Sequence, residues 1–231
     1  EELILSGPHF FVGNPLYKTP RRVCTQNSHY DVIDLTEIPD DYLPRTNYLP
    51  RCSPADYRAR TPKVAWAASS PLVSDHFRIV VNNMLSPPGE RTFQPAIVPP
   101  GLAHVHTVNA YVFADPEDMT TAAATWLGLP VDFLVKSTGA GHLQPNMARR
   151  LPIATTFRAE LQLRALLLNC LIVHYQQLWK TQFRREFLRD SWARDDARLD
   201  AKRFAQLGHE WNAAVPLRTD FERREALVEV D

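Results

Sequence analysis

The amino-acid sequence predicts a mixed α+β fold: a proline-rich β-sheet platform with short helices, followed by a long buried helix and C-terminal helices. Eighteen of the 19 prolines precede residue 158, in a region of short β-branched and aromatic runs separated by Gly, Pro and Asp. After residue 158 the apolar residues recur at intervals of three, four and seven, which indicates helix. We therefore divide the chain into a β-rich platform, 1–157, and a helical part, 158–231. We expect the two to form one structural unit that is a fragment of a larger protein.

The first part contains eight runs typical of strands, at 3–6, 9–13, 30–35, 63–69, 77–85, 92–100, 104–114 and 131–137. One helix is predicted within 116–128, because Pro116 suits a first helical position and Gly128 suits a helix end. Residues 38–62 hold five prolines and little periodicity. They predict an ordered excursion or a long loop.

The second part opens with a predicted helix over 158–190. Its residues 161–173 are apolar nearly all round, so this half of the helix should be buried on most sides. Cys170 lies among leucines there and is interpreted as a core residue. Further helix is expected near 200–213 and 219–229.

The composition constrains the function and the location. Lys and Arg total 26, as do Asp and Glu, and this balance counts against a stand-alone nucleic-acid binder. Arg supplies 21 of the 26 positive charges, and Arg pairs bidentately with phosphate and guanine, although a GC-rich genome would also enrich it. No run is long enough to span a membrane, and three scattered cysteines favour a reducing compartment. We expect a cytoplasmic chain with no membrane association.

The stretch Gly13-Asn14-Pro15-Leu16-Tyr17 differs by one residue from the Asn-Pro-Pro-Tyr loop with which some enzymes methylate the exocyclic amine of a flipped base. Leu16 stands where the second proline belongs, and a turn that closes a strand also explains the pattern. A methyl-donor site would need a strand, a glycine-rich turn and a second strand ending in an acid. Residues 131–143 offer Gly139-x-Gly141 without that second strand. We therefore expect no catalytic residue and no cofactor in this chain.

Other chemistry has weaker support. His104 and His106 share one face of a predicted strand, but no third ligand at a metal-binding spacing is evident, so no metal site is predicted. No nucleophile elbow is present. One alternative stays open, an independent α/β enzyme or small-ligand protein that uses these histidines or the glycine loop.

Five stretches together carry a resemblance to a known family. They are GPHFFVGNPLYKTPR (7–21), HYDVIDLTEIPDDYLPRTNYLP (29–50), FRIVVNNMLSPPGERTFQPAIVPPG (77–101), FLVKSTGAGHLQPNMARRLPI (133–153) and LRTDFERREALVEVD (217–231). The chain resembles the C-terminal target-recognition region of large adenine-specific DNA methyltransferases, as found in type IIG restriction–modification proteins and phage-defence systems. The resemblance covers nearly the whole chain.

The resemblance implies a DNA-sequence recognition module whose partners are double-stranded DNA and an upstream methyltransferase domain of the parent chain. The catalytic loop and the bound S-adenosylmethionine would belong to that upstream domain. A fused endonuclease activity is compatible with the family. Relatives often carry a second Arg a few residues after the one matching Arg78, where this chain has Asn82 and Asn83.

Two loops have side chains suited to DNA. Lys18, Arg21 and Arg22 have no acid near them in sequence until Asp31, which suits phosphate anchoring. In the second loop, glycines permit close backbone approach, Pro145 could open a helix whose N-terminus favours a phosphate, and Gln or Asn can pair with adenine. The predicted DNA contacts, including two from the family motifs, are Lys18, Arg21, Arg22, Arg78, Arg91, Lys136, Ser137, Thr138, Gly139, Gly141, His142, Gln144 and Asn146.

Overall fold

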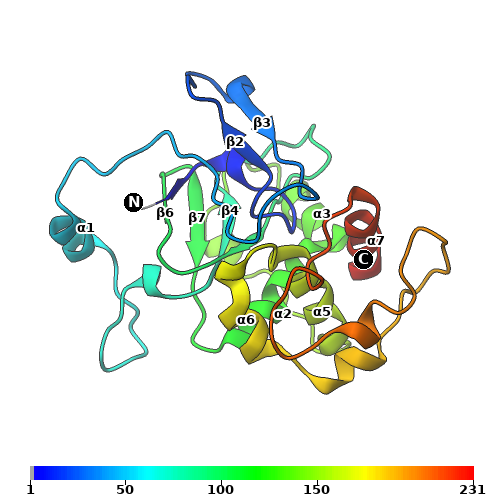
Figure 1. The fold of residues 1–231 in the computed structure, drawn as a ribbon. Helices are drawn as coiled ribbons and strands as arrows, with labels where there is room; N and C mark the ends of the chain where they lie inside the picture. Colours follow the sequence, from blue (N-terminus) through cyan, green and yellow to red (C-terminus); the bar gives the residue numbers. More distant parts are fainter. Residues whose placement is uncertain (1–2) are drawn as a thin grey trace.

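The computed structural model describes residues 3–231 and confirms the mixed α+β class (Figure 1). The strands are β1 (Ile4–Leu5), β2 (Lys18–Pro20), β3 (Tyr30–Val32), β4 (Arg78–Asn82), β5 (Ala96–Val98), β6 (Ala103–His104) and β7 (Val108–Tyr111). The α-helices are α1 (Pro54–Arg60), α2 (Pro116–Leu127), α3 (Leu129–Ser137), α4 (Pro145–Ala148), α5 (Arg158–Asn169), α6 (Gln176–Gln182) and α7 (Asp220–Val230). None of these helices is long and apolar enough to cross a lipid bilayer.

The strands form three small sheets. β4 is the centre of an antiparallel sheet of order β5-β4-β7, in which Ile79 lies between Ile97 and Tyr111. β2 and β3 form an antiparallel hairpin, and β1 pairs in parallel with β6. In Figure 1 the hairpin projects above the central sheet, and helices α2, α5 and α6 lie below it.

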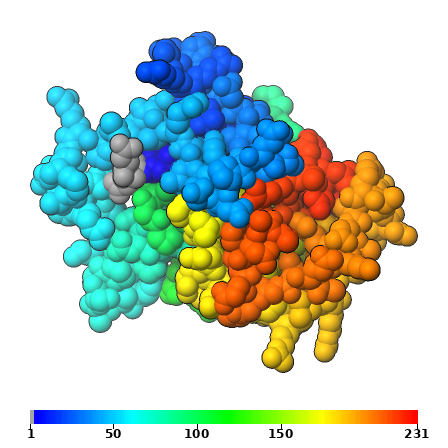
Figure 2. Space-filling view, viewed as in Figure 1, coloured from blue at the N-terminus to red at the C-terminus, as the bar shows by residue number. Residues whose placement is uncertain are grey.

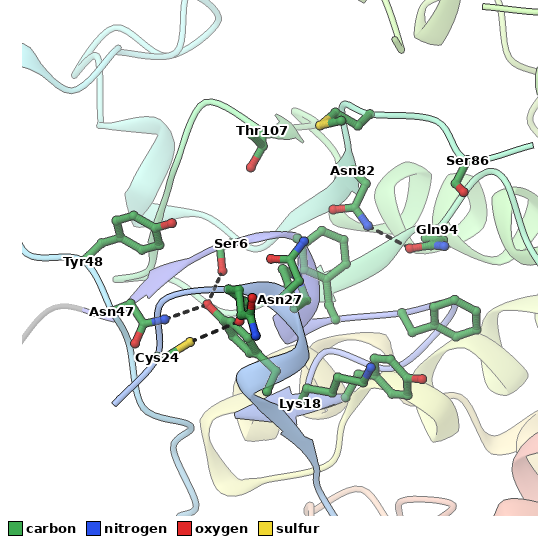
Figure 3. A pocket seen from close by; sticks show the side chains of 18 of the residues that line it. Ser6, Lys18, Cys24, Asn27, Asn47, Tyr48, Asn82, Ser86, Gln94 and Thr107 are labelled. Atoms are coloured by element: carbon green, nitrogen blue, oxygen red, sulfur yellow. Dashed lines mark hydrogen bonds between the residues drawn. The ribbon is translucent and has the colours of Figure 1, made fainter. Parts of the chain in front are cut away.

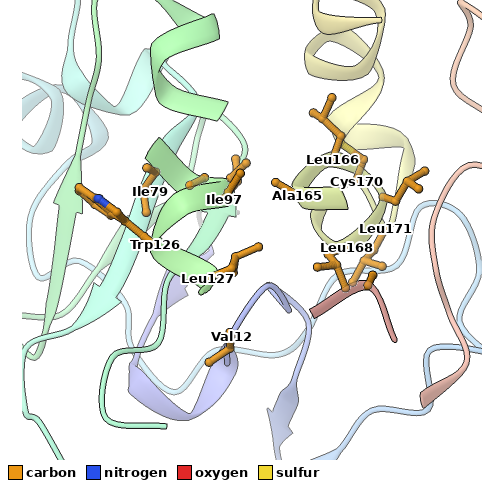
Figure 4. Close-up of a cluster of buried hydrophobic side chains, with 14 of the residues drawn as sticks. Val12, Ile79, Ile97, Trp126, Leu127, Ala165, Leu166, Leu168, Cys170 and Leu171 are labelled. Carbon is orange, nitrogen blue, oxygen red and sulfur yellow. The ribbon is translucent and has the colours of Figure 1, made fainter. Parts of the chain in front are cut away.

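The main hydrophobic core lies between the central sheet and the helices (Figure 4). Ile79 and Ile97 of the sheet and Leu127 of α2 face Leu166 of α5 across this core. The cluster extends from Val12 near the N-terminus to Ala226 in α7. Residues before and after position 158 therefore contribute to the same core.

The outer edge of β5 is closed by side chains from the helical part. The Ile97 N–H donates to Oδ1 of Asn169 over 2.8 Å, and the Ile97 carbonyl accepts from the Tyr175 hydroxyl, also over 2.8 Å. An edge strand otherwise presents unpaired peptide groups that can recruit another chain. Here two buried polar side chains occupy these groups, so the sheet has no free edge at Ile97.

Helices α2 and α7 lie where the sequence predicts helix, and each begins after a side chain that caps it. Asp115 lies just before Pro116, and its carboxylate accepts from the Glu117 N–H. At the other end, α2 stops at Leu127, and Gly128 follows it. α7 begins after Thr219, whose hydroxyl accepts from the Glu222 N–H. These contacts satisfy N–H groups that a helix leaves free at its start. The expectations for 116–128 and 219–229 are confirmed.

The expected strand at 131–137 is wrong, because these residues belong to helix α3. Pro130 occupies the first turn, and Val131 and Val135, one helical turn apart, are both buried. The β-branched residues suggested a strand, but their spacing of four places them on one face of a helix.

Two further expected strands, at 9–13 and 63–69, are also wrong. A 3₁₀ helix spans Gly7–His9, and the chain then turns tightly so that Phe11 pairs with Asn14. Residues 63–72 fold back on themselves, with Lys63 paired to Leu72. The other expected strands of the first part are present but shorter, as β1, β3, β4, β5, β6 and β7.

The expected helix over 158–190 is interrupted. α5 ends at Asn169, whose side chain bonds to β5, and Cys170 leaves the helical conformation with ψ of 56°. Cys170 is fully buried, as expected. The expected helix at 200–213 is also wrong, because only the 3₁₀ turn Phe204–Gln206 forms there.

The segment 38–62 is a long excursion that carries the short helix α1. Ser53 starts this helix by accepting from the Asp56 N–H over 3.1 Å. Figure 2 shows the cyan excursion on one side of the molecule and the blue β2–β3 hairpin on top. The orange and red C-terminal segments lie on the opposite side from the excursion.

Candidate nucleic-acid interface

The glycine loop, residues 136–146, runs from the last two residues of α3 to the first two of α4 and is anchored to the segment that follows β4. The Leu85 N–H donates to the Gly141 carbonyl, and the Leu143 N–H donates to the Asn83 carbonyl. The exposed predicted residues on this loop are Lys136, Ser137, Thr138, Gly139, Gly141, His142, Gln144 and Asn146. The loop therefore presents its polar groups from a backbone that is held to the central sheet.

The two glycines of this loop differ in whether their backbone conformation favours glycine. Gly139 has φ of +64°, a conformation that side chains disfavour. Gly141 has no such φ, and a Cβ placed on it would meet no atom within 4 Å. The fold does not require glycine at 141, so its bare backbone is open to an approaching ligand. The predicted helix after the loop is present, but α4 is a single turn of four residues.

Beside the glycine loop lies a hollow of about 870 Å³, which we name the amide hollow (Figure 3). The two meet where Met84, on the hollow's wall, pairs with His142 of the loop. The neutral polar groups on the wall include Gln26, Asn27, Asn47, Asn82 and Gln94, and the aromatic groups include Phe11, Tyr17, Tyr30 and Tyr48. No Asp or Glu lies among the described lining residues. The wall thus combines amide donors and acceptors with aromatic rings.

Hydrogen bonds order one side of the amide hollow. The Asn82 Nδ2 donates to Gln94 Oε1 over 2.7 Å. The Tyr30 hydroxyl lies 2.9 Å from Ser6 Oγ and accepts from Asn47 Nδ2 over 3.1 Å. A Cβ at Gly7 would lie 2.6 Å from Asn82 Oδ1, so a larger residue there would displace this amide.

The buried His9 supports this wall from behind. Its Nδ1 lies 3.0 Å from Ser6 Oγ, and its Nε2 lies 2.8 Å from the Arg45 carbonyl. A carbonyl only accepts, so Nε2 carries the proton and Nδ1 accepts from Ser6. Burial lowers the pKa of His9, which keeps the ring neutral.

The N-terminal basic cluster is less free than its sequence suggested. Lys18 lines the amide hollow, and its ammonium group lies 4.9 Å from the centre of the Tyr17 ring. The pairing of β2 with β3 brings Asp31 to 2.8 Å from Arg21, and hydrogen bonding to this carboxylate raises the pKa of Arg21. Arg22 is exposed and forms no ion pair within residues 3–231. Of the three, Lys18 and Arg22 are the more available to a phosphate.

The two predicted arginines from the family motifs are both buried. Nη2 of Arg78 donates to the Leu102 carbonyl over 2.6 Å. Arg91 donates to the Leu127 carbonyl over 3.1 Å and approaches Asp231 at 3.9 Å. Arg91 is thus engaged inside the fold, whereas Arg78 lines a second hollow, described below.

The Asn-Pro-containing stretch forms a turn in the core. Gly13 has φ of +62°, and Asn14 Oδ1 accepts from the Leu16 N–H over 3.0 Å. The Gly13 carbonyl accepts from Nη2 of Arg223 over 2.8 Å. These contacts account for Gly13 and Asn14 within the fold.

The histidines of residues 104–106 do not form a cluster with other metal ligands. Nδ1 of His104 lies 3.1 Å from the Val105 carbonyl. Burial and the neighbouring Arg78 lower the pKa of His104. Within residues 3–231, no group of three His, Cys, Asp or Glu side chains is placed to hold a metal ion.

Sequence reasoning missed most of the amide hollow. Its amides come from segments far apart in the chain, and only the fold brings them together. One signal was available, since Asn82 stands near the position where the resembling family often carries an arginine. Comparisons with family models, with curated proteins and with solved structures gave no match to this chain.

Proposed function

We propose that this chain is the DNA-recognition module of an adenine-specific DNA methyltransferase or restriction–modification protein. In this proposal it holds loops over the DNA groove while an upstream domain of the same protein methylates a flipped adenine. The observation that carries it is the continuous surface formed by the glycine loop and the amide hollow, joined at Met84 and His142.

The chemistry of that surface suits DNA in two ways. Gln and Asn amides can pair bidentately with adenine, and aromatic rings can stack on bases. Lys18 and Arg22 lie near the same hollow and suit contacts to phosphates, which fix the register of a protein on DNA. The absence of carboxylates from the described wall removes a source of repulsion for a polyanion.

Methyl transfer is assigned to the upstream domain, together with S-adenosylmethionine. Two observations support this assignment, since Leu16 replaces a proline and the Asn14 amide is occupied inside its turn. Titration calorimetry of S-adenosylmethionine into this chain should give no heat of binding. Micromolar affinity would contradict the assignment.

The DNA proposal is tested by fluorescence anisotropy with short duplexes at several salt concentrations. The isolated chain should bind with a dissociation constant of about 10⁻⁴–10⁻⁶ M, falling steeply in affinity as salt rises. A nanomolar affinity that does not change with salt concentration, or no binding at low salt, would contradict the proposal.

Two substitutions test different kinds of DNA contact on this surface, and a third serves as a control. Gly141→Ala adds a methyl group where only a ligand would meet it, so it should weaken DNA binding and leave the melting temperature unchanged. Arg22→Ala should weaken binding to all duplexes alike and reduce the salt dependence. Arg185→Ala removes an exposed arginine on the 3₁₀ helix Arg185–Arg189 and serves as the matched control.

Gln144→Ala separates base reading from general affinity. In the parent enzyme it should cost roughly 1–3 kcal/mol on the preferred site and much less on scrambled duplexes, because only the preferred site offers the bidentate pair. An equal loss on both would remove the glycine loop as a base reader.

One observation favours a second function, a small-ligand protein. The amide hollow has the volume of many small-molecule sites, which measure about 300–1,000 Å³. In that case Gly141→Ala and Arg22→Ala would leave DNA binding at the level of Arg185→Ala, and nucleosides or similar polar ligands would raise the melting temperature.

A further inference from the structure

A second hollow, of about 810 Å³, lies between the excursion that carries α1 and strands β6 and β7. We name it the arginine hollow after four residues on its wall, Arg51, Arg60, Arg78 and Arg149. His104 lines it as well, and no Asp or Glu is among the described lining residues. Four arginines thus line one concavity, and no carboxylate is among its described lining residues.

Arg78 has the least compensated guanidinium of the four buried arginines. Arg164 contacts two carboxylates, Asp190 and Glu229, and Arg91 approaches one. Arg223 has no carboxylate in contact but donates to three carbonyls. Arg78 is 3% exposed, forms no ion pair within residues 3–231, and donates one hydrogen bond.

The remaining donors of Arg78 are incompletely satisfied. Its Nε is buried and has no hydrogen-bond partner within residues 3–231. Asp75 and Tyr57 act on Arg78 electrostatically, and Asp75 itself lies 3.8 Å from Arg58. A buried cation without a carboxylate in contact is unfavourable, and a bound anion would offset this desolvation.

The other three arginines are free to act with Arg78. Arg51, Arg60 and Arg149 are exposed and form no ion pair with any residue from 3 to 231. Guanidinium groups match the oxygens of phosphate bidentately, and several of them around one cavity form a strong phosphate site. A carboxylate ligand would use fewer of these donors, since it has two oxygens.

We propose that the arginine hollow is a binding site for a phosphate group, with Arg78 at its base and Arg51, Arg60 and Arg149 around it. The inference does not depend on the DNA proposal. The phosphate comes either from a nucleic-acid backbone or from a small phosphate ester, and the two sources share the same recognition chemistry.

The position of the hollow connects it to the surface described above. Thr107 lines the amide hollow, and the next residue, Val108, lines the arginine hollow. The chain from His142 to Arg149 likewise runs from the edge of one hollow to the edge of the other. A nucleic-acid strand with a base near the amide hollow could therefore place a backbone phosphate among the arginines.

The test uses inorganic phosphate and adenosine 5′-monophosphate as probes, with titration calorimetry and thermal melting of the whole chain. Both probes should bind and raise the melting temperature, and chloride at equal ionic strength should not. Arg78→Met should lower the affinity for both probes at least tenfold. Arg149→Gln, an exposed change that leaves the core intact, should lower it several-fold, and Arg185→Gln should have no effect.

The same variants identify the source of the phosphate. If Arg78→Met and Arg149→Gln also weaken duplex binding, the ligand is the DNA backbone; if they weaken only the mononucleotide, it is a small phosphate ester. Either result supports the site. Failure of both probes to bind, or binding that neither variant changes, overturns it. A loss of DNA binding confined to Gly141→Ala would leave the DNA proposal standing without this site.

Discussion

The two parts of the chain contain similar numbers of arginines but neutralise them differently. Ten of the 21 arginines lie in residues 1–157 and eleven in residues 158–231. Within the described structure, three of the first ten form an ion pair with a carboxylate, compared with eight of the eleven. The supply of carboxylates does not explain this, because twelve Asp and Glu lie in residues 3–157 and twelve in 158–231.

Arginines in the helical part mostly pair with carboxylates and so connect segments of the fold. Most arginines in the platform have no such pair and could contact a ligand. In the helical part, Arg164 reaches Asp190 on a 3₁₀ turn and Glu229 on α7, so its charge joins three segments. In the platform, Arg78 and its neighbours face a hollow instead. A net charge of zero therefore conceals an uneven distribution of arginines that form no ion pair within the described structure.

Replacing Arg164 tests the first half of this comparison and should have the largest effect. Arg164→Met would leave Asp190 and Glu229 without their shared cation, so the free energy of unfolding should fall by about 3–5 kcal/mol. Arg78→Met should cost much less, because Arg78 contacts no carboxylate within residues 3–231 and donates a single hydrogen bond, to the Leu102 carbonyl. Urea denaturation of both variants measures the contrast, and equal losses would refute it.

Glycine-to-alanine substitutions should lower the free energy of unfolding by intermediate amounts. Gly13→Ala would force a left-handed residue, at about 1–2 kcal/mol, and would push a Cβ to 3.3 Å from Leu127, adding roughly 1–3 kcal/mol for overpacking. Gly139→Ala has the conformational term without the crowding, and Gly141→Ala has neither. The loss of unfolding free energy in urea should follow that order. A stable Gly13→Ala protein would show that the turn adapts.

The pH dependence should give the smallest effect and comes from the platform. Burial lowers the pKa of His9 in the folded chain below its ordinary value of 6.5. The unfolded state therefore binds more protons in acid, and stability is full above pH 6.5 and falls as the pH drops below it. His9→Gln should reduce this slope in urea midpoints between pH 7 and 5. The exposed His174→Gln is the control and should keep the slope of the unsubstituted chain.

Local signals predicted the fold where the chain satisfies its own backbone nearby. α2 could be placed from Pro116 and Gly128 at its two ends, and its capping residue Asp115 bonds to an N–H group only two residues away. The end of α5 could not be placed, because the Asn169 side chain bonds to Ile97, 72 residues earlier. Such a partner leaves no trace in the spacing of apolar residues.

The candidate site, like the fold, could be predicted only where neighbouring residues in the sequence form it. The glycine loop was predicted as an exposed polar loop from its own composition, and that exposure is present in the structure. The hollows were not predicted, since each is lined by residues from several distant segments. Asp31 shows the same limit, because the β2–β3 pairing, not sequence distance, brings it to Arg21.

The bond between Arg223 and the Gly13 carbonyl spans 210 residues, and it has a consequence for synthesis. A ribosome adds about 5–20 residues per second, so the turn at Gly13 waits about 10–40 seconds for its guanidinium partner. During that interval the strand residues of the platform have been synthesised, but Arg223 has not. Its guanidinium group donates to the carbonyls of Gly13, Leu168 and Leu217 in the folded chain. Emergence of α7 from the ribosome would then be the step that holds the Gly13 turn in place.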